Sequence, residues 1–539
     1  MKTLFRISLI VDLFFYIAII LNALPLFCLK FFPTLDGASH LYNANIIDRL
    51  ISDKSSIIHD FFTMNTFPVP NWTTNILLAC TNFFLPAFIA EKIVLVIYLV
   101  GLPLSFKYFI MSVAPNNNGL AFFIFPFCYS FLFYMGFYNF CFSFIFVFLA
   151  MANYFKQEGI FSGKRTLIFF ILVILIYFSH AVTFGFFIIV FIFSVMMKNL
   201  PVIFNPGNLK SIKKEIKNNR WIILLLLVIL VLFIGFLSVH FTSFSGASQP
   251  FSVLCQWIFL CKPVITFVYE TEYKYTTVFF LTALSIFIMV LFKRASDMKK
   301  GSDVSHKRNI DIITSGLNKS DGILFSSLGI IILFFIVPDN SLAGMMSDRL
   351  ILLFYIFFIM WLAVQSVPRW LTYVAAAIII FCQFNLVKNR FKINKELSEC
   401  ASEIYQVTNY IEDGSVILPV NYSDNYLLTH FSNYTAVEKD VVVLENVEAS
   451  MRWFPVKWNE AKIPRLFLGN YLDFPHVYFP LSRQEPTQKP IDYVLIWGDM
   501  QKLFMEREKR IKDALSESYS EVFSNSSNTI KLFKYHAAD

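Results

Sequence analysis

Long apolar stretches with almost no charged residue constrain this chain more than any other feature. A helix that crosses a bilayer needs about 20 apolar residues. The clearest stretches of that length cover residues 7–29, 92–112, 220–242, 276–292, 350–366 and 370–387. Hydrophobic residues make up 57% of the chain and charged residues 15%, against about 45–50% and 25% in soluble domains. The sequence therefore predicts a polytopic α-helical membrane protein and excludes a soluble enzyme, a disordered chain and a fibrous repeat.

Three further apolar segments raise the predicted number of spans to eleven. Residues 120–155 and 166–197 are each long enough for two helices, with breaks at Gly136 and at Ser179-His180. Residues 322–337 supply one more short helix. The first run, which has no small-residue cleavage site, is expected to remain as the first span.

The placement of lysine and arginine predicts which loops face the cytoplasm. Basic clusters at 156–165, 198–220 and 293–320 lie between apolar runs, and such clusters mark cytoplasmic loops. With the N-terminus inside, residues 30–91 form an outer loop. The span 92–112 and the two helices within 120–155 make the three crossings that bring the chain from this loop to the cytoplasmic cluster at 156–165. A fourth crossing at 72–90 would place that cluster outside, so 72–90 is expected to dip into the membrane from outside without spanning it.

The C-terminal part of the chain has a different character. Residues 397–539 alternate short apolar runs with polar turns, which predicts a soluble α/β domain after a membrane domain at 1–396. The expected strands are 415–421 and 492–499, and the expected amphipathic helices are 396–411 and 501–516. One feature opposes an outer location of this domain, because basic residues follow the last span directly. They are Lys388, Arg390, Lys392 and Lys395.

Charge and cysteine content exclude several other classes of site. The net charge of +8 comes from lysines placed for topology, so nucleic-acid binding is not predicted. The eight cysteines form no CxxC pair and indicate neither a zinc site nor a disulfide framework. Cys255 and Cys261 are expected to be free thiols.

The predicted topology collects ionisable and aromatic residues on the outer side of the membrane. Ionisable groups near a bilayer are costly and usually functional. The candidate site residues are Asp36, His40, Trp72, Tyr138, Asn139, His180, Glu270 and Arg349. Asp36 and His40 are four residues apart and share a face if the segment is helical.

Each candidate also has a purely structural interpretation. Asp36 can form a turn and helix-cap pair with Gly37, and His180 can hydrogen-bond a backbone carbonyl between two helices. Glu270 and Glu272 can be solvated loop residues. Arg349 opens a predicted span at its N-terminus, where a cation opposes the helix dipole, and Asp348 or lipid headgroups can offset that charge.

These features together resemble the GT-C superfamily of membrane glycosyltransferases. The resemblance covers the whole architecture: a first span, a large outer loop with an early acidic residue (Asp36) and a Pro-rich approach to a helix (PVPNW, 68–72), and a soluble domain after the last span. The short second outer turn carries Tyr138-Asn139, where the oligosaccharyltransferases of this superfamily have an acidic pair. A bound divalent metal is therefore not indicated, and no cofactor is predicted.

The resemblance implies a polyprenyl-phosphate-linked sugar donor and an extracytoplasmic glycan, lipid or protein acceptor. Asp36 would then be the general base, and Arg349 would bind the donor phosphate. His40 and His180 would assist in binding phosphate or sugar, and Trp72 and Tyr138 offer flat faces to a sugar ring. An enzyme of the bacterial inner membrane with its active site and C-terminal domain in the periplasm is expected.

Two other functional classes remain open from the sequence. A transporter or flippase would place ionisable residues in the middle of its spans and would show inverted repeats or broken helices. A non-catalytic membrane scaffold would use the C-terminal domain to bind a partner and would tolerate replacement of Asp36 and Arg349.

Overall fold

The computed structural model describes residues 2–156, 163–203, 230–231, 234–235, 247–302, 317–339, 344–451, 453–459, 491–505 and 509–536. The chain divides into two compact units that interleave along the sequence. The helical unit comprises residues 1–24, 97–133 and 138–391, and the mixed unit comprises 25–96, 134–137 and 392–539. The mixed unit thus joins the predicted outer loop and the predicted C-terminal domain in one body.

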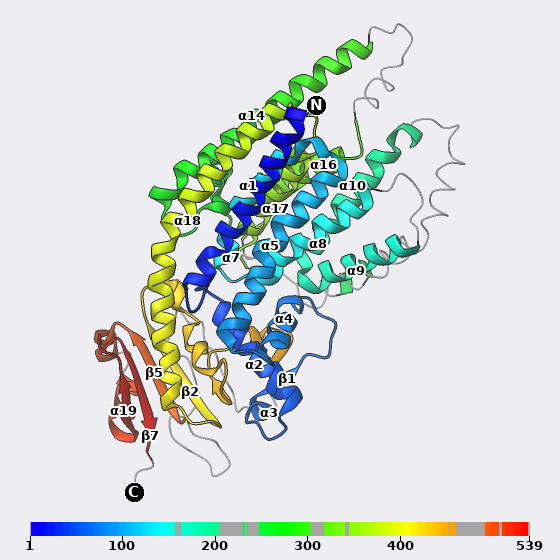
Figure 1. Cartoon of the computed structure of the whole chain (residues 1–539). Helices are drawn as coiled ribbons and strands as arrows, with labels where there is room; N and C mark the ends of the chain where they lie inside the picture. The colour runs from blue at the N-terminus through cyan, green and yellow to red at the C-terminus, as the bar shows by residue number, and fades with distance from the viewer. Residues whose placement is uncertain are drawn as a thin grey trace. The chain divides into compact units, whose positions relative to one another are not determined.

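Long helices account for about half of the described chain (Figure 1). They are α1 (Lys2–Cys28), α5 (Ala87–Val113), α8 (Tyr138–Phe155), α9 (Gly163–Ser179), α10 (Ala181–Ile203), α14 (Tyr269–Ser302), α16 (Asp321–Ile336), α17 (Met346–Ala363) and α18 (Arg369–Gln406). A shorter helix, α13 (Phe251–Phe259), carries Cys255. All eight cysteines are free, as predicted for Cys255 and Cys261.

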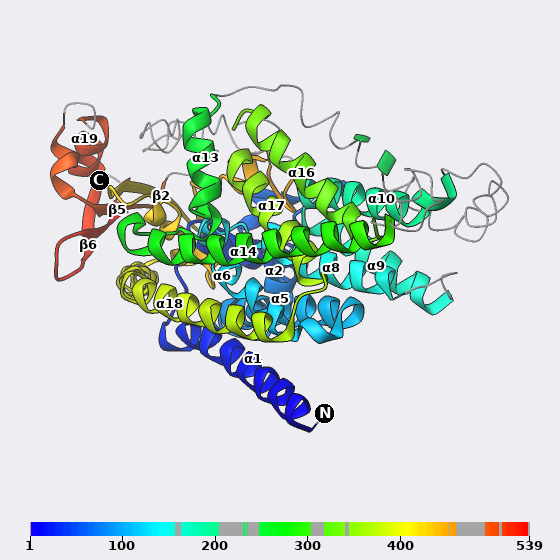
Figure 2. The same cartoon turned by 90° about the horizontal axis from the view of Figure 1, so that it is seen from above.

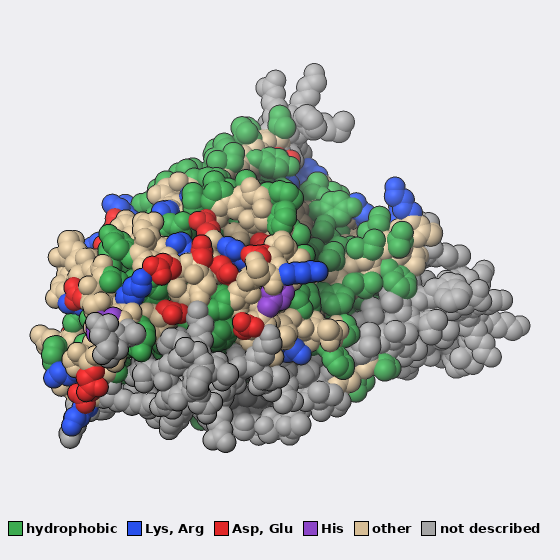
Figure 3. Space-filling model, turned by 90° about the horizontal axis from the view of Figure 1, so that it is seen from below, with side chains coloured by type: hydrophobic (Ala, Val, Ile, Leu, Met, Phe, Trp, Pro, Cys, Tyr) green, Lys and Arg blue, Asp and Glu red, His purple; other side chains and the backbone are tan. Residues whose placement is uncertain are grey.

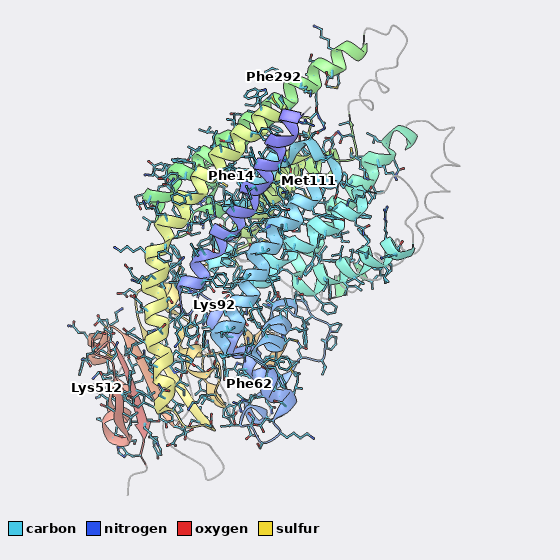
Figure 4. All side chains as sticks on the ribbon, in the orientation of Figure 1. Phe14, Phe62, Lys92, Met111, Phe292 and Lys512 are labelled. Atoms are coloured by element: carbon cyan, nitrogen blue, oxygen red, sulfur yellow. The ribbon has the colours of Figure 1, made fainter. Side chains whose placement is uncertain are left out.

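Seven helices in the described part of the chain are long and apolar enough to cross a membrane, namely α1, α5, α8, α10, α14, α17 and α18. The apolar helix α16 is shorter, and the predicted span at 220–242 lies mostly outside the described residues. The chain therefore has the helices of an integral membrane protein, whereas the predicted count of eleven spans is not established. Large apolar side chains such as Phe14 and Phe292 are 53% and 73% exposed (Figure 4), as lipid-facing positions would be.

The first of the two helices predicted within residues 120–155 is wrong, whereas the predicted break at Ser179-His180 is confirmed. Residues 115–134 form a 3₁₀ segment, η1 (Pro115–Ile124), and two single turns, α6 (Phe125–Cys128) and α7 (Phe131–Tyr134). Pro126 lacks an N–H for a continuous helix, and Tyr129 leaves the helical region at φ −114° and ψ 54°. Apolar composition alone could not reveal these interruptions.

The prediction of one membrane-dipping helix over 72–90 is also wrong. Residues Thr73–Asn82 form α4, the chain then turns, and Ala87 already begins the long helix α5. Pro86 explains the break, because proline lacks the N–H that would continue α4 and disfavours helical geometry at the preceding residue. The last residues of the segment therefore belong to a helix long enough to span a membrane.

Within the helical unit, α14 and the first part of α18 lie side by side in both views (Figures 1 and 2). A buried ion pair joins them, since Arg390 Nη2 lies 2.6 Å from Glu272 Oε2 and both side chains are 1% exposed. Glu272 also accepts hydrogen bonds from the backbone N–H groups of Thr266 (2.9 Å) and Phe267 (3.1 Å). Glu272 is thus not a solvated loop residue.

The same ion pair explains part of the basic cluster after the last predicted span. Arg390 is neutralised inside the protein, and Lys392 and Lys395 form exposed i,i+4 pairs with Glu396 and Glu399. Helix α18 continues to Gln406 without a break. The predicted amphipathic helix at 396–411 is therefore mostly the end of the last apolar helix and not a separate element.

The mixed unit contains a five-stranded sheet in the order β3-β2-β5-β7-β6. Its strands are β2 (Ser415–Tyr422), β3 (Val441–Val443), β5 (Tyr493–Gly498), β6 (Tyr519–Ser524) and β7 (Ile530–Tyr535). The first three strands pair in parallel, and β7 pairs antiparallel with β5 and β6. The two predicted strands are confirmed as β2 and β5. The predicted helix at 501–516 is a short 3₁₀ segment, η8 (Met500–Phe504), and α19 (Lys509–Ser518), with residues 506–508 outside the described chain.

The outer-loop segment of the mixed unit is attached to this sheet region. It contains α2 (Gly37–Ser52), α3 (Ile58–Phe61), α4 and β1 (Phe62–Met64), and β1 pairs with β4 (Val456–Trp458). The Tyr42 hydroxyl on α2 donates to the Val441 carbonyl (3.0 Å) and accepts from the Val443 N–H (3.1 Å). Helix α2 is therefore held against the strand that precedes the acidic segment 445–448.

Candidate functional site

Asp36 stands at the start of α2, where the chain turns into the helix. Its backbone is at φ −91° and ψ −1°, and its side chain makes no capping hydrogen bond to the helix. The predicted turn-and-cap role therefore does not account for the carboxylate. The Asp36 side chain is 20% exposed, so it is accessible to a substrate while most of its surface is enclosed.

His40 lies on the first turn of α2, as the four-residue spacing from Asp36 predicted. Its Nε2 lies 2.8 Å from the carbonyl oxygen of Gly136 and its Nδ1 lies 3.2 Å from Glu448 Oε1. Because a carbonyl oxygen can only accept, Nε2 carries a proton. His40 is thus held on both ring nitrogens by residues far away in the sequence.

A second histidine, His430, lies on the other side of Asp36 in the contact network. Its Nε2 is 3.6 Å from Asp36 Oδ1, and its Nδ1 is in direct contact with Glu445 Oε1. Glu445 also accepts from the Ser432 hydroxyl (2.6 Å) and the Asn433 amide (3.1 Å). The chain therefore forms a carboxylate–imidazole–carboxylate series from Glu445 to Asp36.

The glutamate partner of His40 is held by amide side chains. Glu448 Oε2 accepts from Asn43 Nδ2 (2.5 Å), and Asn43 Oδ1 accepts from Asn446 Nδ2 (2.6 Å). Asn43 lies on α2, whereas Asn446 and Glu448 follow β3. These bonds keep Glu448 directed toward α2.

The environment shifts the pKa values of all three central groups. Burial raises the pKa of the Asp36 carboxyl to about 6, although the His430 charge opposes this. Burial disfavours the charge on both imidazoles, but Glu448 raises the pKa of His40 to about 9 and Glu445 does the same for His430. Near neutral pH the site therefore holds two imidazolium–carboxylate pairs and an Asp36 carboxylate that is mostly ionised.

Such an arrangement is suited to proton transfer. A partly exposed carboxylate with a pKa near the operating pH is an effective general base, and the charges of His430 and His40 favour its ionised form. Among the described residues, no group of three or more histidine, cysteine, aspartate or glutamate side chains is arranged to hold a metal ion.

The helical unit brings two other predicted residues together. Arg349 Nη1 lies 2.8 Å from His180 Nε2, and Arg349 Nε donates to the Gly344 carbonyl (2.9 Å). The guanidinium also lies 5.5 Å from the ring centre of Phe140. Asp348, which could have offset the Arg349 charge, forms its ion pair with Lys262 at 3.1 Å.

The remaining predicted residues have varied settings. Tyr138 and Asn139 are buried at the start of α8, and Glu270 is exposed in the first turn of α14. Trp72 precedes α4 in the mixed unit and is partly buried. Asp36, His40 and Trp72 thus belong to the mixed unit, whereas Tyr138, Asn139, His180, Glu270 and Arg349 belong to the helical unit.

Sequence reasoning missed His430, Glu445 and Glu448. A usable signal was present, because the two glutamates follow the VVVL run of a parallel strand directly. Ligands of parallel sheets gather at the carboxyl ends of the strands, so acidic residues at that position are candidates for a site. His430, a single histidine in a loop, has no comparable local signature.

Comparison with known proteins finds no family model that matches this chain and no curated protein similar to it in sequence. The functional assignment therefore rests on the chemistry of the residues themselves. Acidic, basic and histidine side chains lie close together on the face seen in Figure 3. Within the mixed unit, the group around Asp36 is the arrangement that most directly suits catalysis.

Proposed function

We propose that this chain is a membrane glycosyltransferase of the GT-C type. It transfers a sugar from a polyprenyl-phosphate donor to an acceptor on the extracytoplasmic side of a bacterial inner membrane. The observation that carries the proposal is the setting of Asp36. A partly exposed carboxylate at the start of the first outer helix lies near two histidines. A glutamate beside each histidine stabilises its charged form.

In the proposed reaction the acceptor hydroxyl attacks the anomeric carbon of the donor sugar. Asp36 takes the hydroxyl proton while the new C–O bond forms and the bond between the sugar and the phosphate oxygen breaks. The electron pair of the broken bond stays on the polyprenyl phosphate. Arg349 binds that phosphate with its paired N–H donors, and His180 orients the guanidinium from 2.8 Å.

The other candidates have supporting roles in this proposal. Trp72 and Tyr138 supply flat surfaces for sugar rings, and Asn139 and Glu270 supply hydrogen-bonding groups. His40 completes the charge arrangement around Asp36. The sheet region of the mixed unit contributes His430 and Glu445, which makes it part of the enzyme and not a separate accessory domain.

The substitution Asp36→Asn tests the general base. It keeps the size of the side chain and removes the proton acceptor, so donor cleavage is expected to fall by about 10²-fold or more while donor binding persists. The assay follows release of labelled sugar from a panel of polyprenyl-phosphate hexoses and pentoses by protein in nanodiscs, with water as acceptor. A wild-type rate for this variant would eliminate the proposed role of Asp36.

The pH dependence of the same reaction provides an independent prediction. The base must be ionised, so the rate should rise with pH through about 6, the pKa of Asp36. It should fall again through about 9, as His40 and His430 lose their protons. A rate that is flat between these two pH values and decreases on both sides is the expected profile, measured as kcat/KM.

A further inference from the structure

His430 has the geometry of a residue that acts on Asp36 and not on a substrate. It precedes η6 (Phe431–Ala436), and its partner Glu445 follows β3, so two separate segments of the mixed unit position one imidazole. The His430 side chain is 7% exposed, and Asp36 is 20% exposed. The carboxylate is therefore the more accessible of the two groups, and the imidazole is the more enclosed.

The distances indicate what His430 contributes. Its Nδ1 is bound to Glu445, whereas its Nε2 lies 3.6 Å from Asp36 Oδ1. That separation is too long for a strong hydrogen bond but short enough for an ion pair. A charged imidazole at this distance stabilises the Asp36 carboxylate without occupying the lone pair that must accept a proton.

The other groups around Asp36 contribute less directly. His40 faces Glu448 and the Gly136 carbonyl with its two ring nitrogens. Glu445 and Glu448 are each paired with a histidine, so their negative charges are partly balanced. Segment 134–137 contributes the backbone of Gly136 next to Asp36. His430, with Nε2 3.6 Å from Asp36 Oδ1, is the charged group that lowers the pKa of the carboxyl most, and His40 lowers it less.

We propose that the His430–Glu445 pair is the positioning unit of Asp36, with Glu445 keeping the imidazole charged and oriented and His430 holding the carboxylate ionised. This inference deepens the proposed function, because it assumes that Asp36 is the base. Its electrostatic part concerns only the protonation of Asp36 and can be measured without any substrate. His430 is a positioning residue and not a catalytic one.

Infrared titration of Asp36 tests the proposal directly. The carboxyl band of Asp36 is isolated by subtracting the spectrum of a matched protein that carries Asp36→Asn. In His430→Gln the midpoint is expected to rise by at least about one pH unit, since a cation at this distance lowers a carboxyl pKa by about 1–3 units. His430→Lys retains a positive charge and should keep the midpoint near that of the wild type.

The substitution His40→Gln is the matched control for this measurement. It removes a comparably buried imidazole, but one whose two ring nitrogens face Glu448 and the Gly136 carbonyl and whose charge lowers the pKa of Asp36 less than that of His430 does. Its effect on the Asp36 midpoint should be clearly smaller than that of His430→Gln. An unchanged midpoint in His430→Gln, or an equal shift in His40→Gln, would overturn the proposal.

A second measurement covers the case in which His430→Gln does not fold. Nitrogen-15 NMR of histidine-labelled wild-type protein, with the His430 signal assigned through Glu445→Gln, should show a charged imidazole at neutral pH. A neutral His430 at that pH would contradict the proposal. If the wild type cleaves none of the donors, the glycosyltransferase assignment fails, while both spectroscopic results still decide the role of His430.

Discussion

The substitution Glu272→Ala is expected to lower the free energy of unfolding of the helical unit by about 3–5 kcal/mol, the usual cost of leaving one partner of a buried pair uncompensated. Arg390 is 1% exposed, and its guanidinium donates to Glu272 and to the carbonyls of Tyr129 (3.1 Å) and Val264. Without the carboxylate, the arginine charge would remain buried with only neutral acceptors. Denaturant unfolding in detergent micelles measures the loss.

Two further variants separate the ion pair from general damage to α14. Glu270→Ala removes an exposed acid two residues away and should change the stability by less than about 0.5 kcal/mol. The double variant Glu272→Ala/Arg390→Met removes both charges and should recover part of the loss. Equal effects of Glu270→Ala and Glu272→Ala would show that the buried pair has no special role.

The substitution Gly136→Ala is expected to lower the rate of donor cleavage by about 10²-fold through its effect on Asp36. Gly136 has a positive φ of 83°, and a Cβ on it would lie 2.6 Å from both the Cβ and the backbone nitrogen of Asp36. The start of α2 would have to move, and a shift of about 1 Å in a catalytic group can cost about 10²-fold in rate. The rate assay of Asp36→Asn measures this effect.

Gly414→Ala is the matched control for backbone strain. Gly414 also has a positive φ, 76°, and lies in the same unit, but a Cβ there would meet no atom within 4 Å. It should therefore show only the cost of a left-handed alanine, about 1–2 kcal/mol of stability, with donor cleavage retained. Similar rates in the two alanine variants would mean that the close approach to Asp36 does not matter.

Local sequence patterns were sufficient for much of the secondary structure. The apolar runs became α1, α5, α10, α14, α16, α17 and α18 because a helix satisfies its own backbone within one segment. The two runs rich in β-branched residues became β2 and β5. The four-residue spacing of Asp36 and His40 placed both at the start of one helix. Each of these outcomes depends on neighbours in the chain, which the sequence displays directly.

Local patterns failed where breaks in a helix depend on individual residues. Apolar content did not distinguish the single turns at 115–134 from a span, and it did not reveal the turn before Pro86. The breaks arise from missing N–H groups and from single departures in φ and ψ. Such effects are invisible to an average over a window of apolar residues.

The sequence by itself determined that this chain forms long apolar helices and a C-terminal sheet, and it singled out Asp36. Only the tertiary structure decided that His430 and Glu445 lie next to Asp36, because they are about 400 residues away along the chain. Only the tertiary structure decided that Arg390 is buried, because its partner Glu272 lies 118 residues earlier in the chain. Contacts of this kind follow from packing between distant segments, and no spacing or periodicity in the sequence encodes them.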